Sequence, residues 1–166
     1  HEQGASFTLT NAPIAMRMGE LPKLGEKVNA EIIPADATSL EDLENLYTKS
    51  MEVLGGKIDF ILHSIGMSPN VRKGRDYGNL NYDWFQKTLD VSALSFHKMM
   101  QTAEKLDVMN EWGSIVGLSY IAAQRTFPDY ADMAQAKSLL ESIARSYGYR
   151  LGVDKKVRVN TISQSP

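Results

Sequence analysis

Three consecutive stretches decide the fold class of this chain: GSIVGLSY at 113–120, YADMAQAKSLLESIARSYGYRL at 130–151 and VRVNTI at 157–162. The first and third are short, nearly continuous apolar runs, a pattern typical of strands that are covered on both faces. The middle stretch has the period of a long helix. A strand, a helix and a second strand in this order predict one βαβ unit of a parallel sheet.

The same alternation extends towards the amino terminus. A helix is expected over about Ser39–Leu54, because Thr38 and Glu41 have capping-box spacing and two glycines end it. A longer helix is expected over about Tyr82–Leu106, and we find no repeat or linker that indicates a second domain within residues 1–166. The pattern predicts an α/β protein whose strands are Ser6–Thr10, Asn29–Pro34, Ile58–Ile65, Gly113–Leu118 and Val157–Ile162.

The two long helices, at 82–106 and 130–151, carry apolar residues on more than one face. A helix that covers only its own sheet needs a single apolar stripe, so the extra apolar surface predicts contacts with a further copy of the chain. We therefore expect a homo-oligomer, with a tetramer as the favoured form.

The composition excludes several classes of function. The chain has 166 residues, of which 43% are apolar and 23% charged, with 18 basic and 20 acidic side chains and no cysteine. Without cysteine there is no disulfide, no thiolate nucleophile and no zinc ribbon, and three histidines give no argument for a metal site. A pI near 5.9 argues against a nucleic-acid surface, and no apolar stretch approaches the ~20 residues of a membrane helix. We expect a cytoplasmic protein, and His1 is not expected to be its biological start.

Tyr130 and Lys137 form the first candidate for chemistry, seven residues apart at the start of an expected helix. In an ideal helix they fall within roughly 20° of each other and about 10 Å apart along the axis. The ammonium could bind the hydroxyls of a ribose, and its charge would favour the phenolate of the tyrosine. Such a tyrosine can donate a proton or stabilise an enolate oxygen. A surface pair without function has the same spacing.

Other residues gather at the expected strand ends. Tyr120 follows the strand at 113–118, and Gly66 follows the strand at 58–65, where a glycine permits close approach of a ligand. Tyr120 is also consistent with an aromatic residue that only packs. His63 is expected to be a hydrogen-bonded core histidine rather than a base or a ligand, and the same is expected of His97 on its apolar helix.

The stretch Met67–Asn79 is predicted to be irregular, and it lies just beyond the carboxyl end of an expected strand, where ligands bind in open α/β sheets. Its basic residues are Arg72, Lys73 and Arg75. They could meet an anionic substrate or carrier, while a solvated basic loop is the simpler interpretation.

These segments together resemble a known family. The run LSYIAAQRTFPDYADMAQAKSLLESIARSYG at 118–148, with HSIGMS before it and VRVNTISQSP after it, is similar to the enoyl-acyl-carrier-protein reductases of bacterial fatty-acid synthesis, within the short-chain dehydrogenase/reductase superfamily. The most specific element is a Tyr-x6-Lys pair with a second tyrosine ten residues upstream. The Tyr-x3-Lys motif of most of the superfamily is absent, because Ala134 follows Tyr130 by four positions and Met133 precedes Lys137 by four.

The resemblance implies a Rossmann-like, doubly wound parallel sheet and a function. NADH, or alternatively NADPH, would deliver hydride to a trans-2-enoyl thioester of acyl carrier protein, giving the saturated acyl form. The resemblance assigns Tyr130 to the thioester carbonyl and Lys137 to the nicotinamide ribose, with Tyr120 as the other active-site tyrosine. It also assigns cofactor contacts to Thr10, Asp36, Ala37 and Ile65, and a substrate contact to Ser68. Four of these residues have an ordinary alternative: Asp36 as a polar residue before the capped helix, Thr10 as a strand-end residue, Ile65 as a core residue and Ser68 as a turn residue.

The family's first strand and glycine-rich turn, and its last strand with the segment that closes over substrate, have no counterpart in the sequence. In the doubly wound order, the first strand would lie between the strands expected at 6–10 and 58–65. The sheet is therefore expected to be incomplete. Residues 1–166 are expected either to belong to a longer polypeptide or to need a complementing segment, and to be inactive alone. Two alternatives stay open: a related oxidoreductase acting on a different enone, and a catalytically dead relative that senses nucleotide.

Overall fold

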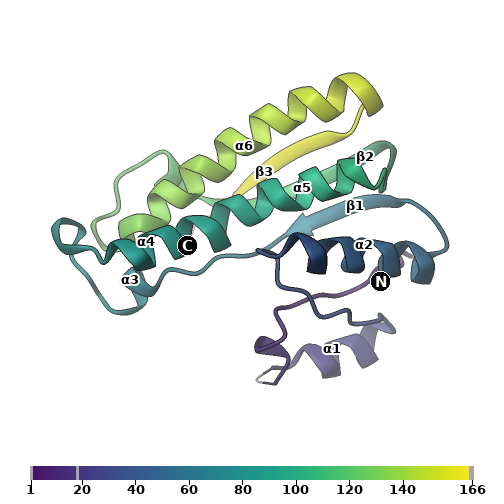
Figure 1. Cartoon of the computed structure of the whole chain (residues 1–166), viewed down its shortest axis with the longest axis horizontal. Coiled ribbons are helices and arrows are strands. Elements are labelled where there is room, and N and C mark those ends of the chain that lie inside the picture. The colour runs from purple at the N-terminus through teal and green to yellow at the C-terminus, as the bar shows by residue number, and fades with distance from the viewer. Residues whose placement is uncertain (1, 18, 165–166) are drawn as a thin grey trace.

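The computed structural model describes residues 2–17 and 19–164 and alternates helices with strands (Figure 1). Short 3-10 turns occur at Ala15–Arg17, Tyr77–Asn79, Ile121–Ala123 and Pro128–Tyr130, and a π-helical turn occurs at Asp90–Leu94. The helices and strands are α1 (Leu21–Val28), α2 (Leu40–Leu54), β1 (Ile58–His63), α3 (Pro69–Arg72), α4 (Tyr82–Leu89), α5 (Ser95–Lys105), β2 (Met109–Tyr120), α6 (Ala131–Lys155) and β3 (Arg158–Gln164).

The three strands form one parallel sheet in the order β1-β2-β3, with Leu62, Val116 and Asn160 aligned across it. This confirms the predicted α/β class and shows a partial Rossmann-like sheet. The predicted strands at 6–10 and 29–34 are wrong as continuous strands. Only a single parallel bridge joins Leu9 to Ile32 there, although the Ile33 and Ala35 N–H groups also donate to the Leu9 and Asn11 carbonyls.

The predicted helices are confirmed with corrections at their ends. The amino-terminal cap of α2 is Ser39, whose Oγ accepts from the Asp42 N–H at 3.2 Å, so the expected capping box of Thr38 and Glu41 is wrong. Thr38 instead donates through its Oγ1 to Asp36. The helix expected at 82–106 is continuous through α4, the π-helical turn and α5. Helix α1, which has eight residues, is not among the helices predicted from the sequence.

Helices α2, α5 and α6 lie on one side of the sheet (Figure 1). Tyr47 on α2 donates to the Met99 carbonyl on α5 at 3.2 Å, and its ring is buried. The core between these helices and the sheet includes Phe96, Ile115 and Leu140, each fully buried. The chain comes so close at Gly117 that a Cβ there would lie 3.1 Å from the Phe96 ring, so α5 packs directly on the β2 backbone.

The opposite face of the sheet is open over the residues that the structure describes. Phe60 and Leu62 on β1 are 48% and 57% exposed, and Ile162 on β3 is 54% exposed. No helix described is both long enough and apolar enough to span a membrane.

Candidate active site

Two tyrosine rings meet where β2 ends and α6 begins. Tyr120 is the last residue of β2, and Tyr130 ends the 3-10 turn that leads into α6. Their ring centroids are 4.5 Å apart and the planes are inclined by 32°. Phe127 also packs against Tyr120, with the ring centroids 5.7 Å apart. The pair therefore sits at the carboxyl edge of the sheet, where parallel α/β proteins place their ligands.

Tyr130 is not part of the helix, contrary to the expectation from its spacing to Lys137. The residue between Tyr130 and the body of α6, Ala131, has φ 36° and ψ −131°, which interrupts the helical backbone. The ideal-helix geometry expected for the two side chains therefore does not apply. The direction of Tyr130 is set by the turn before α6, in which its N–H donates to the Phe127 carbonyl at 3.1 Å.

Lys137 lies on α6 and is 7% exposed. Its Nζ donates to the Leu118 carbonyl at 2.6 Å and to the Ile65 carbonyl at 3.3 Å, so it ties the carboxyl ends of β1 and β2 together. Burial lowers the pKa of Lys137 to about 8. An ammonium has three N–H donors, so one is left for a bound group. The bare backbone at Gly66 keeps this place open, because a Cβ there would lie 3.7 Å from the Lys137 Nζ.

The protonation of Tyr130 differs from the expectation. Burial, and then the neighbouring Tyr120, raise the pKa of Tyr130 above its ordinary value. The expected stabilisation of a phenolate by Lys137 is wrong, because the pKa of Tyr130 is raised rather than lowered and Lys137 is not among the causes of the shift. Tyr130 is thus a neutral phenol at pH 7, which makes it a hydrogen-bond donor rather than a base.

The segment after β1 is more regular than predicted, because α3 and the turn at 77–79 form within it. Ser68 is buried and caps α3 by accepting from the Val71 N–H at 3.0 Å. Among the basic residues of the segment at 67–79, Arg75 packs over the Trp84 ring at 5.3 Å and donates to the Asn79 carbonyl. Arg72 and Lys73 are exposed.

Two buried carboxylates on α6 were not predicted from the sequence. Asp132 follows Tyr130 by two residues and accepts from Ser68. Glu141 accepts from Ser119 at 2.7 Å and from Gln124 at 3.2 Å, residues that flank Tyr120. The only sequence signal was an acidic residue within a run of small and apolar ones. The neighbouring sequence does not indicate which residues bind Asp132, because its partner Ser68 is 64 positions away.

The expected contacts for the adenosine end form a separate group. Thr10 follows the bridge at Leu9, and the Asn11 carbonyl beside it accepts from the Ala35 N–H at 3.1 Å, which places Thr10 near Asp36 and Ala37. Asp36 is exposed and accepts from the Thr38 N–H and Oγ1, and these hydrogen bonds lower the pKa of its carboxyl. In the part of the chain described, no hydrogen bond links this group to Tyr130 or Lys137, whereas Ile65 is linked directly to Lys137.

The two histidines on the helices and strands differ from each other. His63 is 1% exposed, as expected for a core histidine, and its Nε2 is 2.8 Å from the Ser95 Oγ. Its Nδ1, however, has no partner among the described residues, and burial lowers its pKa to about 4. The expectation that His97 is a core residue is wrong, because its side chain is exposed and its ring edge packs on Tyr147.

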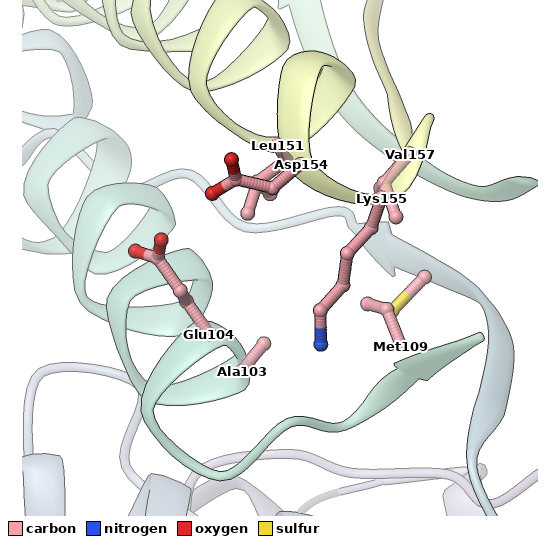
Figure 2. A pocket seen from close by; sticks show the side chains of 7 residues that line it. All are labelled: Ala103, Glu104, Met109, Leu151, Asp154, Lys155 and Val157. Carbon is pink, nitrogen blue, oxygen red and sulfur yellow. The ribbon is translucent and has the colours of Figure 1, made fainter. Parts of the chain in front are cut away.

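A hollow of about 90 Å³ lies at the other end of the sheet, away from the tyrosines (Figure 2). The side chains around it come from the carboxyl ends of α5 and α6, from the start of β2 and from the residue before β3: Ala103, Glu104, Met109, Leu151, Asp154, Lys155 and Val157. It has none of the predicted site residues in its lining, so we do not assign the candidate active site to it.

A parallel sheet with a tyrosine pair and a buried lysine at its carboxyl edge is typical of Rossmann-like oxidoreductases, and comparison with known proteins agrees. The family model described as enoyl-(acyl carrier protein) reductase matches residues 1–166. This chain therefore belongs to the enoyl-(acyl carrier protein) reductase family.

Individual relatives support the assignment. A protein of Rhizobium meliloti named enoyl-[acyl-carrier-protein] reductase [NADH] 1 is 33% identical over 99% of this chain and 59% of its own length. FabI of Rickettsia bellii is 37% identical over 86% of this chain and 53% of its own length. The chain thus spans a little over half the length of these curated relatives.

Solved structures agree closely with the fold. A crystal structure of the FabI–NADH complex from Alistipes finegoldii has a TM-score of 0.97 and 64% sequence identity, over 99% of this chain and 58% of that one. The enzyme from Aquifex aeolicus, named as NADH-dependent, has a TM-score of 0.88 at 28% identity.

Proposed function

We propose that this chain carries the central part of an NADH-dependent reductase that converts trans-2-enoyl thioesters of acyl carrier protein into saturated acyl thioesters. The observation that carries the proposal is that the Tyr120–Tyr130 pair, with ring centroids 4.5 Å apart, lies at the same carboxyl edge of the sheet as the buried Lys137. Several relatives are named as NADH-dependent enoyl-[acyl-carrier-protein] reductases, and one similar structure is a FabI–NADH complex.

The residues fit a bound nicotinamide nucleotide. Lys137 has a remaining N–H donor next to the bare backbone of Gly66, which suits a ribose hydroxyl. When bound, the nicotinamide would supply the hydride. We assign Ile65 to the same end of the cofactor, because its carbonyl already binds Lys137. Thr10, Asp36 and Ala37 are assigned to the adenosine end.

The chemistry assigned to the protein is stabilisation of charge. Hydride addition to the β-carbon moves negative charge to the thioester oxygen, where a neutral phenol gains strength as a hydrogen-bond donor. A proton from solvent, added at the α-carbon, then completes the saturated acyl group. Tyr130 supplies this phenol, because its raised pKa keeps the proton on its oxygen. Tyr120 packs against the Tyr130 ring, and we assign Ser68, at the start of α3, to the substrate side.

The test measures oxidation of NADH with a crotonyl thioester by the full chain, meaning the natural protein that contains residues 1–166. Tyr130→Phe should lower turnover roughly 10²–10³-fold, because it removes one donor to the developing oxyanion, while NADH affinity from fluorescence changes little. Tyr149→Phe is the matched control, since Tyr149 lies on α6 and is 79% exposed. A second arm places residues 1–166 in the matching part of Alistipes finegoldii FabI, which they cover to 61%.

The outcomes separate the alternatives. Equal turnover in Tyr130→Phe and the parent would contradict the role of Tyr130. NADH binding without turnover in both arms would indicate a nucleotide sensor. Turnover with another enone but not with the crotonyl thioester would indicate a different substrate.

The same proposal includes a cytoplasmic homotetramer. Its support is apolar surface left exposed on the long helices, at Tyr82 and Leu94 on the α4–α5 helix and at Val153 on α6. Light scattering that finds a monomer of the full chain at micromolar concentration would contradict it.

A further inference from the structure

Asp132 is a fully buried carboxylate that accepts hydrogen bonds from three side chains. The Ser68 Oγ donates to Oδ1 at 2.5 Å, and the Asn70 Nδ2 donates to Oδ2 at 2.8 Å. The Thr88 Oγ1 lies 2.8 Å from Oδ2 and 2.8 Å from the Trp84 carbonyl, so these two acceptors share its single proton. Burial of a carboxylate is unfavourable unless donors replace water, so this site is built around the charge. The position in the first turn of α6 adds the favourable field of a helix amino terminus.

The three donors come from the segment that follows β1 and from α4. Ser68 caps α3, and Thr88 lies on α4. Asn70 also clamps the backbone of Asn81, because its Nδ2 donates to the Asn81 carbonyl at 3.1 Å and its Oδ1 accepts from the Asn81 N–H at 3.0 Å. Asp132 therefore fastens residues 67–81, on the expected substrate side, to the start of α6.

The backbone between Asp132 and Tyr130 is strained. Ala131 has φ 36°, a conformation that residues with a Cβ seldom adopt, and its side chain is 4% exposed. Such a conformation persists only where the surroundings determine it. On one side it is held by the stacking of Tyr130 on Tyr120, and on the other side by the hydrogen bonds of Asp132.

We propose that Asp132 is a positioning residue that holds the Tyr130 hydroxyl in register with the segment at 67–81. Through its three donors it fixes both the strained turn and the substrate side of the site. It does not touch the reacting atoms. This inference rests on the proposed function of Tyr130 as the hydrogen-bond donor to the thioester.

The principal test is a double-mutant cycle in the full chain, with NADH and a crotonyl thioester. Asp132→Asn should lower kcat by about 10- to 100-fold, because small displacements of a catalytic group are costly, with a smaller change in the KM for NADH. In the Tyr130→Phe background the same substitution should change kcat less than about twofold, because the group it positions is gone. Equal losses of kcat in both backgrounds would overturn the proposal.

A milder variant guards against a folding defect. Thr88→Val removes one donor to Asp132 and should lower kcat in the same background-dependent way, by about threefold to tenfold. Thr102→Val is its matched control, because Thr102 is also buried and its Oγ1 also donates to the carbonyl four residues before it, without reaching Asp132. Equal effects of the two valine variants would contradict the proposal.

A readout without turnover separates this inference from the proposed function. With 3-fluorotyrosine in the chain, the fluorine resonance of Tyr130 should shift in Asp132→Asn and in Thr88→Val, while that of the exposed Tyr149 stays unchanged. A shift in a protein that has no reductase activity would support the positioning role and contradict the function. An unchanged Tyr130 resonance in both variants would overturn the positioning role.

Discussion

The two faces of the β1-β2-β3 sheet come from the same strands but differ in cover. On the helix side Ile115 and His63 are buried against α5 and α6. On the other side Phe60 and Leu62 of β1 remain about half exposed. Helix α6, which covers this face, also supplies Lys137, Asp132 and Glu141 to the candidate active site. The difference indicates that the covered face governs stability and site geometry, while the open face is available for association.

The largest expected effect sharpens this contrast through two phenylalanines. Phe96→Ala should lower the free energy of unfolding by ~3–5 kcal/mol, because it empties a fully buried site between His63 and Gly117. Phe60→Ala on the open face should cost about 1 kcal/mol, because only half of its surface is buried. Urea unfolding of the 166-residue chain at submicromolar concentration, followed by tryptophan fluorescence, measures both. Equal costs would mean that the two faces are covered alike.

A pH effect should follow from His63 on the covered face. Burial lowers its pKa from 6.5 to about 4, so between these values the unfolded chain binds a proton that the folded chain does not. Above pH 6.5 the titration of His63 therefore costs nothing. As the pH falls from 6.5 towards 4, it lowers the free energy of unfolding by about 3 kcal/mol in total.

Two histidine variants isolate this contribution. In His63→Gln the loss between pH 6.5 and 4 should shrink, because the titrating ring is gone. In His97→Gln it should stay as in the parent, because His97 is exposed. Urea midpoints measured across this pH range for the three chains provide the check, and parallel curves for His63→Gln and the parent would contradict the prediction.

Sequence periodicity predicted the strands and helices of the βαβ units because their signals are local. It also predicted cover on both faces of the sheet, since a nearly continuous apolar strand such as 58–65 gives the same pattern whether or not a second layer of helices is present. The strands expected at 6–10 and 29–34 were less reliable, because a ladder depends on a partner strand and not on composition alone.

The candidate site shows the same limit. Tyr120, Tyr130 and Lys137 could be predicted from their spacing and from the resemblance, and the structure brings them to one edge of the sheet. The strained turn at Ala131 and the partners of Asp132 could not be predicted. They arise from tertiary contacts across 44 to 64 positions, for which the sequence has no periodic signal.

The smallest expected effect concerns association through the open face. The outer edge of β1 has no strand partner in the described ranges, and Leu62 beside it is 57% exposed, so we expect the 166-residue chain to self-associate through this face. Leu62→Ser should weaken the association about tenfold, which corresponds to ~1.4 kcal/mol of lost apolar burial. Leu24→Ser is the matched control, because Leu24 is 44% exposed on α1 and lies outside the sheet. Sedimentation equilibrium of the three chains measures the dissociation constants. If both serine variants associate as tightly as the parent, the open face is not the surface through which the chains meet.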